Sequence, residues 1–193
     1  MKPNHETHET RRRERAKIMR YIALLRGINV GGNTMIKMAE LKSSFEELGF
    51  KNVVSYINSG NLAFDSTKSP EEKVCTKIEK AIEKDFGKTI PVMIREQASI
   101  RNILDNNPFH GAYETHKQMH VLFMKEKMPK DKQDQLKAAE TELEKFEIHD
   151  REIYALLKAG VADSLLGKGF IEKKLKVAIT GRNWRTVEKL AEL

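Results

Sequence analysis

The sequence predicts an α+β protein in which one βαββαβ pattern occurs twice. Short apolar runs, typical of buried strands, alternate with longer stretches whose apolar residues recur at helical spacing. The order of these signals over residues 20–95 returns about 98 positions later, over residues 118–180, and one further helix follows each copy. A structural duplication explains this repetition better than one irregular domain does.

The first copy contains four predicted strands and two predicted helices. The strands are apolar runs bounded by turn residues, and we expect them at 20–26, 53–57, 61–65 and 90–95. The helices are stretches whose apolar residues form one stripe, and we expect them at 38–48 and 70–86. The second and third strands are joined by NSG, residues 58–60, which suits a hairpin turn. This order is the ferredoxin-like split βαβ motif.

The second copy repeats the order after a linking helix, ASIRNILDN. Its strands are expected at 118–125, 146–149, 152–157 and 177–180. One helix is expected from near Pro129, with an apolar stripe of Leu136, Ala139, Leu143 and Phe146. SLLGKGFIEKKL is helix-like although it contains two glycines, and NWRTVEKLAEL is the terminal helix. The sequence therefore predicts two tandem ferredoxin-like halves, with antiparallel sheets and helices packed on one face.

The domain limits follow from the charged start of the chain. Residues 1–18 carry six basic and three acidic side chains, so the other 175 residues hold only +4 of the net charge of +7. The segment HETHETRRRERAK is almost without apolar residues and cannot repay its ordering entropy. We expect a disordered basic tail at 1–18, a first half at 19–110 and a second half at 111–193. The modest remaining excess is typical of a solvated surface.

The composition indicates a cytoplasmic protein. The longest apolar runs, YIALL and IYALL, have five residues, far from the roughly 18 of a membrane span or the 7–15 of a signal-peptide core. We therefore expect no membrane partner. The single cysteine cannot form an internal disulfide, which favours a reducing compartment.

The octapeptide GINVGGNT at 27–34 has some features of a phosphate-binding loop. It matches the G-x-x-x-x-G-K-[ST] template at Gly27, Gly32 and Thr34, but Asn33 occupies the lysine position. The split βαβ order also lacks the parallel sheet of nucleotide triphosphatases, and we reject that function. The glycines still allow backbone amides to approach a ligand closely, or they serve loop geometry alone.

The predicted topology places this loop and the NSG turn at the same end of the first sheet. Arg26, Asn29, Ser59 and Asn61 are then expected to converge, and such groups hold an anion or a carbonyl without proton transfer. The alternative is that the polar side chains only cap and turn the backbone. The candidate ligand-binding residues in this chain are Arg26, Asn29, Gly31, Gly32, Lys37, Ser59, Gly60, Asn61, Arg182 and Asn183.

Two of these candidates come from TGRNW, at the start of the terminal helix. Asn183 is a natural N-cap, and Trp184 shares a face with Val187 and Ala191, so we interpret it as a core residue. Arg182 beside a helix N-terminus favours anions, whereas a surface salt bridge is the commoner role of an arginine.

Four stretches together resemble a known family. LLRGINVGG, YINSGNLAF, NPF at 107–109 and TGRNWRTVEKL, in this order, resemble the bacterial family called domain of unknown function 1697. The resemblance runs from about residue 20 to the C-terminus and implies two tandem ferredoxin-like halves. The family has no established activity, so the resemblance implies a fold and a site but no reaction.

No catalytic set emerges from the remaining residues. There is no C-x-x-C, H-E-x-x-H or G-x-S-x-G motif, and we expect neither a metal nor a cofactor. Cys75 adjoins an apolar helix stripe and is better interpreted as a small buried side chain than as a nucleophile. His149 and Asp150 could form a base and its orienting group, but they fall in a predicted turn.

The sequence therefore leads to a protein that binds a small anionic ligand, a phosphorylated metabolite or a carboxylate, at a glycine-rich patch. Whether it is an enzyme stays open. One alternative is nucleic-acid binding, because RRM modules share the βαββαβ order. Their third strand, however, carries paired aromatic residues, and SGNLAFDS offers only Phe64, so specific nucleic-acid binding is not expected. The other alternative is a scaffold that forms homo-oligomers.

Overall fold

Two four-stranded antiparallel sheets form the framework of the protein. The computed structural model describes residues 17–31 and 34–193, and the strand orders are β2-β3-β1-β4 and β6-β7-β5-β8. The chain is thus an α+β protein, and its two similar halves fit a tandem duplication, as the sequence predicts. Most of the expected tail lies outside the described residues, and β1 already begins at Ile18.

In the first half, two helices pack on one face of the sheet. The strands are β1 (Ile18–Leu25), β2 (Lys51–Tyr56), β3 (Asn61–Thr67) and β4 (Val92–Glu96), and the helices are α1 (Met38–Glu47) and α2 (Glu71–Phe86). Gly87 ends α2 with a left-handed φ of 63°. Phe45 of α1 packs edge-on against Phe64 of β3, with 5.4 Å between the ring centroids. Both rings belong to the buried apolar cluster that forms the core of the first half.

The second half repeats the strands but not all of the helices. Helix α3 (Gln97–Asp105) follows the first sheet. The second half then contains β5 (Met119–Met124), α4 (Lys130–Ala138), β6 (Glu144–His149), β7 (Glu152–Leu157), the short π-helix η1 (Phe170–Lys174), β8 (Ile179–Asn183) and the trailing helix α5 (Trp184–Glu192). The prediction of one helix over SLLGKGFIEKKL is wrong, because two glycines interrupt it and only the short η1 forms there. A Cβ at Gly167 would lie 2.1 Å from Val161 O, and Gly169 has a φ of 73°.

The helix expected after Pro129 is shorter than its apolar stripe indicates. It ends at Ala138, so that Leu143 is exposed and Phe146 belongs to β6. Leu136 and Phe146 nevertheless contribute to one buried cluster. The stripe therefore combined a helix with the strand that follows it, because both turn apolar side chains toward the same core.

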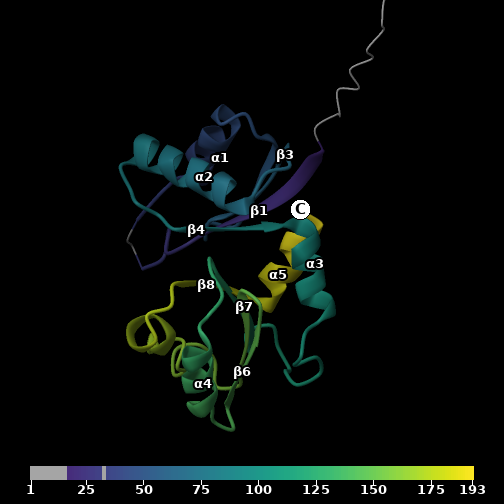
Figure 1. Ribbon diagram of the computed structural model, residues 1–193, viewed down its shortest axis with the longest axis vertical. Coiled ribbons are helices and arrows are strands. Elements are labelled where there is room, and N and C mark those ends of the chain that lie inside the picture. Colours follow the sequence, from purple (N-terminus) through teal and green to yellow (C-terminus); the bar gives the residue numbers. More distant parts are fainter. Residues whose placement is uncertain (1–16, 32–33) are drawn as a thin grey trace, which may run out of the picture.

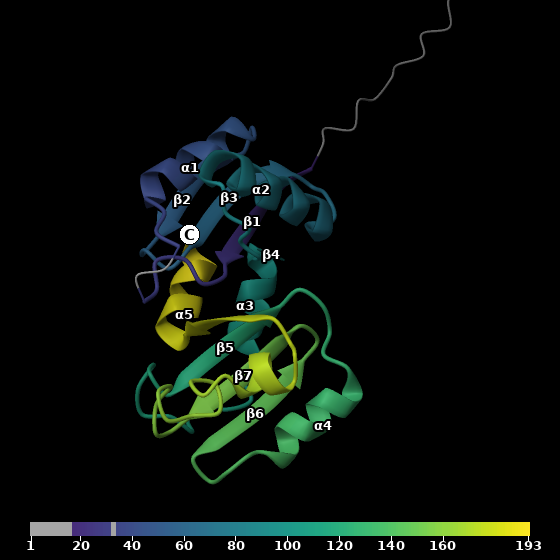
Figure 2. The same ribbon diagram turned by 90° about the vertical axis from the view of Figure 1, so that its left-hand side faces the viewer.

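Helices α3 and α5 lie between the two sheets, while α1 and α2 cover the outer face of the first sheet (Figures 1 and 2). The inner face of the first sheet, including Ile22 and Leu24, forms one buried cluster with these two helices and with β5 and β7. Trp184 belongs to this inter-half core and is 7% exposed. In RRM modules the equivalent sheet face stacks on bases, but here it is covered by the other half.

Candidate functional site

The glycine-rich loop and the hairpin turn lie against each other at one end of the first sheet. Leu25 donates its N–H to Gly60 O at 2.8 Å, and the Asn29 side chain donates to Asn58 O at 2.8 Å. Gly60 has a φ of 76°, and a Cβ there would lie 2.7 Å from Leu25 Cβ. A glycine is therefore required where the turn crosses the end of β1.

Asn29 is the side chain that fastens the loop to the turn. Its Nδ2 donates to Ile36 O at 2.9 Å as well as to Asn58 O, and its Oδ1 accepts from Ile36 N at 2.8 Å. Both amide hydrogens and the oxygen are thus engaged within the protein. Asn29 orders the loop, and its side chain offers no free donor to a ligand.

Arg26 and Lys37 are the two surface cations among the predicted site residues. Arg26 forms an ion pair with Glu172 of η1, so that this pair joins the two halves, and each of its side chains is 36% exposed. Lys37 pairs with Glu40 one helical turn away at 3.1 Å and is 82% exposed. Arg26 therefore lies at the junction of the halves, whereas Lys37 is the solvated N-cap residue of α1.

Arg182 is neither at the surface nor in an ion pair within the described part of the chain. Its side chain is buried in the inter-half contact, and burial lowers the pKa of the guanidinium to about 10, which leaves it charged at neutral pH. All five N–H groups have acceptors within the protein. These acceptors are Asn61 Oδ1 (2.5 Å), Thr180 Oγ1 and Gly181 O (2.8 Å each), Leu25 O and Ser59 O (3.0 Å each) and Gly60 O (3.4 Å).

The neighbouring polar residues support this arginine. Asn61 is fully buried, and its Nδ2 donates to Tyr56 O at 3.1 Å and to Ser59 Oγ at 3.0 Å. Because Ser59 Oγ accepts this bond, its hydroxyl hydrogen is directed elsewhere, and no acceptor for it lies among residues 17–31 and 34–193. Ser59 is half-buried. It is thus a donor at the edge of the site.

Asn183 and the two loop glycines complete the predicted set. Asn183 is the N-cap of α5, as predicted, and its side chain accepts from Thr186 N at 2.9 Å. Gly31 is exposed with a φ of 63°, and Gly32 lies outside the described residues. Among the described residues, neither the Asn183 nor the Lys37 side chain forms a hydrogen bond or ion pair with the side chain of Arg26 or Arg182.

The first half contains a counterpart of Arg182 that the sequence analysis missed. Arg95 in β4 lies opposite Ile22 of β1, just as Arg182 in β8 lies opposite Val121 of β5. Each arginine precedes the next helix by two positions. The observed starts of α3 and α5 align Arg95 with Arg182. The predicted helix starts, Ala98 and Asn183, align Arg95 with Thr180 instead, so the predicted boundaries hid the correspondence.

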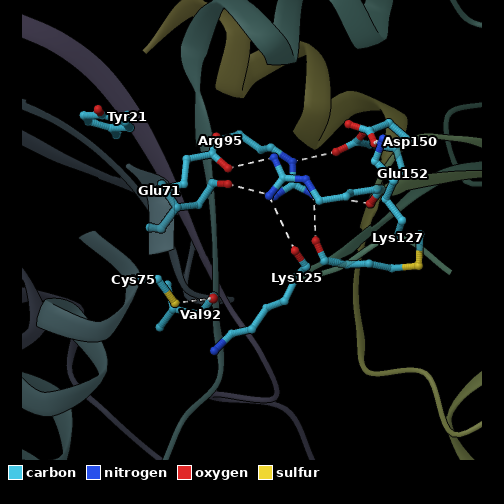
Figure 3. A network of polar contacts seen from close by, with 12 residues as sticks. Tyr21, Glu71, Cys75, Val92, Arg95, Lys125, Lys127, Asp150 and Glu152 are labelled. Carbon is cyan, nitrogen blue, oxygen red and sulfur yellow. Dashed lines mark hydrogen bonds and ion pairs between the residues drawn. The ribbon is translucent and has the colours of Figure 1, made fainter. Parts of the chain in front are cut away.

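Arg95 makes the equivalent contacts from the other side: it extends from the first half to main-chain carbonyl groups of the second half, as Arg182 extends from the second half to the first. It donates to Met124 O at 2.7 Å and to Arg151 O at 3.2 Å, the positions that correspond to Leu25 and Gly60. Its Nε donates to Glu152 Oε1 at 2.6 Å, where Arg182 has Asn61. Figure 3 shows this network, with Glu71 and Glu152 on opposite sides of it.

One difference distinguishes the two arrangements. Arg95 is 2% exposed and faces a carboxylate, Glu152, so its charge is balanced inside the protein. Every acceptor of Arg182 is neutral, and no carboxylate within the described ranges lies at ion-pair distance from it. The hairpin end of the first sheet therefore carries a buried positive charge, whereas the corresponding end of the second sheet does not.

A cavity of about 440 Å³ adjoins the Arg95 network, between α2 and the second half. Two ion pairs cross it: Lys125 with Glu79 at 2.5 Å, and Arg151 with Glu71 at 2.7 Å. The Cys75 thiol, at its wall, donates to Val92 O at 3.0 Å. Burial, and then the Glu79 carboxylate, raise the pKa of this thiol, which is thus a poor nucleophile.

The described residues contain no metal-binding cluster of three or more His, Cys, Asp or Glu side chains. His149 packs on Tyr154, with 5.1 Å between the rings, and Asp150 pairs with Lys127 at 2.7 Å. The sequence had offered His149 and Asp150 as a base and its orienting group, and each has another partner. None of the described helices is long and apolar enough to cross a bilayer.

The protein is thus an α+β chain of two similar halves, and a buried arginine of each half donates hydrogen bonds to the other half. The chain belongs to the family described as protein of unknown function (DUF1697), whose profile matches residues 18–154. It is similar to the conserved bacterial protein SP0830 from Streptococcus pneumoniae, with 26% sequence identity and a TM-score of 0.75 over 91% of this chain and 98% of that chain. No curated protein matches it.

Proposed function

We propose that the protein binds a small anionic ligand, a phosphorylated metabolite or a carboxylate, at the end of the first sheet. The observation that carries this proposal is the unbalanced charge of Arg182. A charge buried without a counter-charge is costly, and proteins normally pair it. An anion at the nearby surface supplies the missing counter-charge.

The interaction acts at a distance, because the guanidinium of Arg182 has no free N–H group. Its acceptors Ser59 O and Gly60 O belong to the hairpin turn, so the positive potential extends to the turn surface. At an effective dielectric constant of about 20, a unit charge attracts an anion roughly 8 Å away by about 2 kcal/mol. This attraction is specific to the first sheet, because Glu152 cancels it in the second.

Arg26 and Ser59 are the groups that touch the ligand in this proposal. Arg26 is partly exposed and exchanges Glu172 for the anion, since a guanidinium binds a carboxylate or phosphate in the same forked geometry. The Ser59 hydroxyl donates the second bond. Asn29 and Asn61 hold the loop and the turn in place, and the exposed glycine Gly31 lies at the edge of the proposed site.

The experiment is a thermal-shift screen of phosphorylated metabolites, nucleotides and carboxylates, followed by calorimetry on each compound that stabilises the protein. Arg26→Ala weakens binding about 10- to 150-fold, the cost of one charge-assisted hydrogen bond. Lys125→Ala is the matched control, because Lys125 occupies the Arg26 position of the second half, and it leaves affinity unchanged. If no anion stabilises the parent protein, the proposal fails.

The finer description of the fold is part of the same proposal. We infer that each half is a ferredoxin-like unit, residues 19–110 and 111–193, on three grounds: element order, strand order and the equivalence of Arg95 with Arg182. The single buried cysteine supports the cytoplasm as the location.

A further inference from the structure

Three large apolar side chains are exposed around the glycine-rich loop. Val30 is 62% exposed, Met35 is 65% exposed and Ile57, in the hairpin turn, is 51% exposed. Single exposed apolar residues are common on soluble proteins, but a group of them at one place marks a binding surface. The question is whether these three form one group.

The hydrogen bonds of Asn29 bring them together. Its side chain bonds to the main chain of Ile36 and of Asn58. Val30 directly follows Asn29, Met35 directly precedes Ile36 and Ile57 directly precedes Asn58. Each exposed apolar residue is thus a chain neighbour of a group gathered around a single amide. We call Val30, Met35 and Ile57 the apolar rim.

The backbone at the rim indicates that the fold does not require these residue types. Ile57 has a φ of 49° and Thr34, beside Met35, has a φ of 52°. The left-handed region is a clear outlier for β-branched residues and costs about 1–3 kcal/mol each. Asparagine or glycine suits such a turn better. Since Ile57 is also exposed, neither the turn nor the core accounts for its apolar side chain.

We propose that the ligand is amphipathic: its phosphate or carboxylate lies at Arg26 and Ser59, and its aliphatic or aromatic body lies on the apolar rim. This inference rests on the proposed function and specifies its ligand class. The positive charge of Arg182 favours an anionic head group. Arg182 bonds to Ser59 O and Gly60 O of the hairpin turn, and Ile57 of the apolar rim lies in the same turn. A second copy of the chain does not fit as well, since three side chains cannot supply the ~800 Å² per partner of a stable interface.

The test is calorimetry on the full chain with a series of one head group: inorganic phosphate, butyl phosphate and hexyl phosphate. Affinity rises with chain length, about twofold to fourfold per methylene that the rim covers. Hexanol, which has the same body without the charge, does not bind measurably. Ile57→Gly removes the body contact and relieves the left-handed backbone, so it lowers the affinity for hexyl phosphate while the melting temperature holds or rises.

Two further variants locate the body contact. Met35→Ala reduces the chain-length dependence and leaves the affinity for inorganic phosphate unchanged. Leu143→Ala, a control of similar exposure in the second half, changes neither. Equal affinity for all three phosphates overturns the amphipathic ligand but leaves the proposed function standing. A chain-length dependence that survives in Ile57→Gly and Met35→Ala also overturns it.

Two outcomes separate the remaining possibilities. If neither inorganic phosphate nor any carboxylate or phosphate ester binds, the proposed function fails and this inference falls with it. If the protein instead shows a concentration-dependent mass that Met35→Ala abolishes and phosphates do not alter, the rim is a contact between copies of the chain, and the inference is overturned.

Discussion

Arg95 and Arg182 occupy the same register in the two sheets, and each donates hydrogen bonds to main-chain carbonyl groups of the opposite half. The two halves are therefore joined by a reciprocal exchange of buried cations in addition to the apolar inter-half core. The sequence suggested Arg182 and Asn61 as ligand contacts. In the structure their side chains bond to each other and to the main chain. The predictions below test the energetics of the arginine exchange and its unequal charges.

Arg182→Met should destabilise the protein by about 3 kcal/mol or more. The methionine fills much of the arginine volume but removes the donors of Asn61 Oδ1 and Ser59 O, and each unsatisfied buried group costs about 1–3 kcal/mol. Urea denaturation gives the free energy of unfolding. Arg185→Met, at an exposed position of α5, is the control. A loss below about 0.5 kcal/mol would show that the carbonyl groups find other partners.

Asn61→Asp should weaken anion binding by placing a carboxylate beside Arg182, as Glu152 lies beside Arg95. Cancelling about 2 kcal/mol of attraction lowers the affinity roughly 30-fold. The variant also loses the bond from Asn61 Nδ2 to Tyr56 O, so its folding is checked by circular dichroism. Calorimetry with the strongest anion from the screen measures the effect. Affinity equal to that of the parent would mean that the charge of Arg182 plays no part.

The protein should lose stability as the pH falls from about 6.5 to about 4, because His120 is buried and its Nδ1 has no hydrogen-bond partner among the described residues. Burial lowers the pKa of His120 to about 4. Between the unfolded and folded pKa values the unfolded chain binds more protons, so stability rises with pH there and is complete above about 6.5.

The loss amounts to about 3 kcal/mol at most, since each pKa unit corresponds to about 1.4 kcal/mol. Urea denaturation across this pH range measures it. The variant His120→Leu removes the titrating group and should flatten this part of the profile. An equally steep profile in the variant would assign the acid sensitivity to other residues.

Gly60→Ala should destabilise the first half more than Gly49→Ala does. Both glycines have left-handed φ values, 76° and 85°, so both substitutions incur backbone strain of about 1 kcal/mol or more. At Gly49 nothing lies within 4 Å of the added Cβ, whereas at Gly60 the new atom meets Leu25 Cβ at 2.7 Å. The difference between the two free energies of unfolding isolates the close approach. Equal losses would show that the turn moves away freely.

The strands could be predicted from the sequence because each is a short apolar run between turn residues. The predicted strand at 152–157 matches β7, and each of the others differs from the structure by one to three residues at one or both ends. Two helices were harder, since local periodicity does not reveal whether a residue such as Phe146 reaches the core from a helix or from a strand. In the second of these predicted helices, SLLGKGFIEKKL, the glycines Gly167 and Gly169 interrupt the helix.

The candidate site was only partly accessible to sequence reasoning. Topology correctly brings the glycine-rich loop to the hairpin turn, which places Arg26, Asn29 and Ser59 at one end of the sheet. The sequence could not show that Arg182 reaches Asn61 from 121 residues away, because such a contact depends on how the two halves pack. Without that contact, a buried arginine and a surface arginine look alike.

The exchange of arginines also sets the order in which the molecule can be completed during its synthesis. The carbonyl groups around Leu25 and Ser59 emerge from the ribosome long before Arg182 has been added. At 5–20 residues per second, the 121 residues between Asn61 and Arg182 take roughly 6–24 s to translate. During this interval the inner sheet face of the first half and the acceptors of Arg182 stay exposed to solvent. A chain that ends before β8 lacks Arg182, so Asn61, Leu25 and Ser59 lose the donor that contacts them in the full structure.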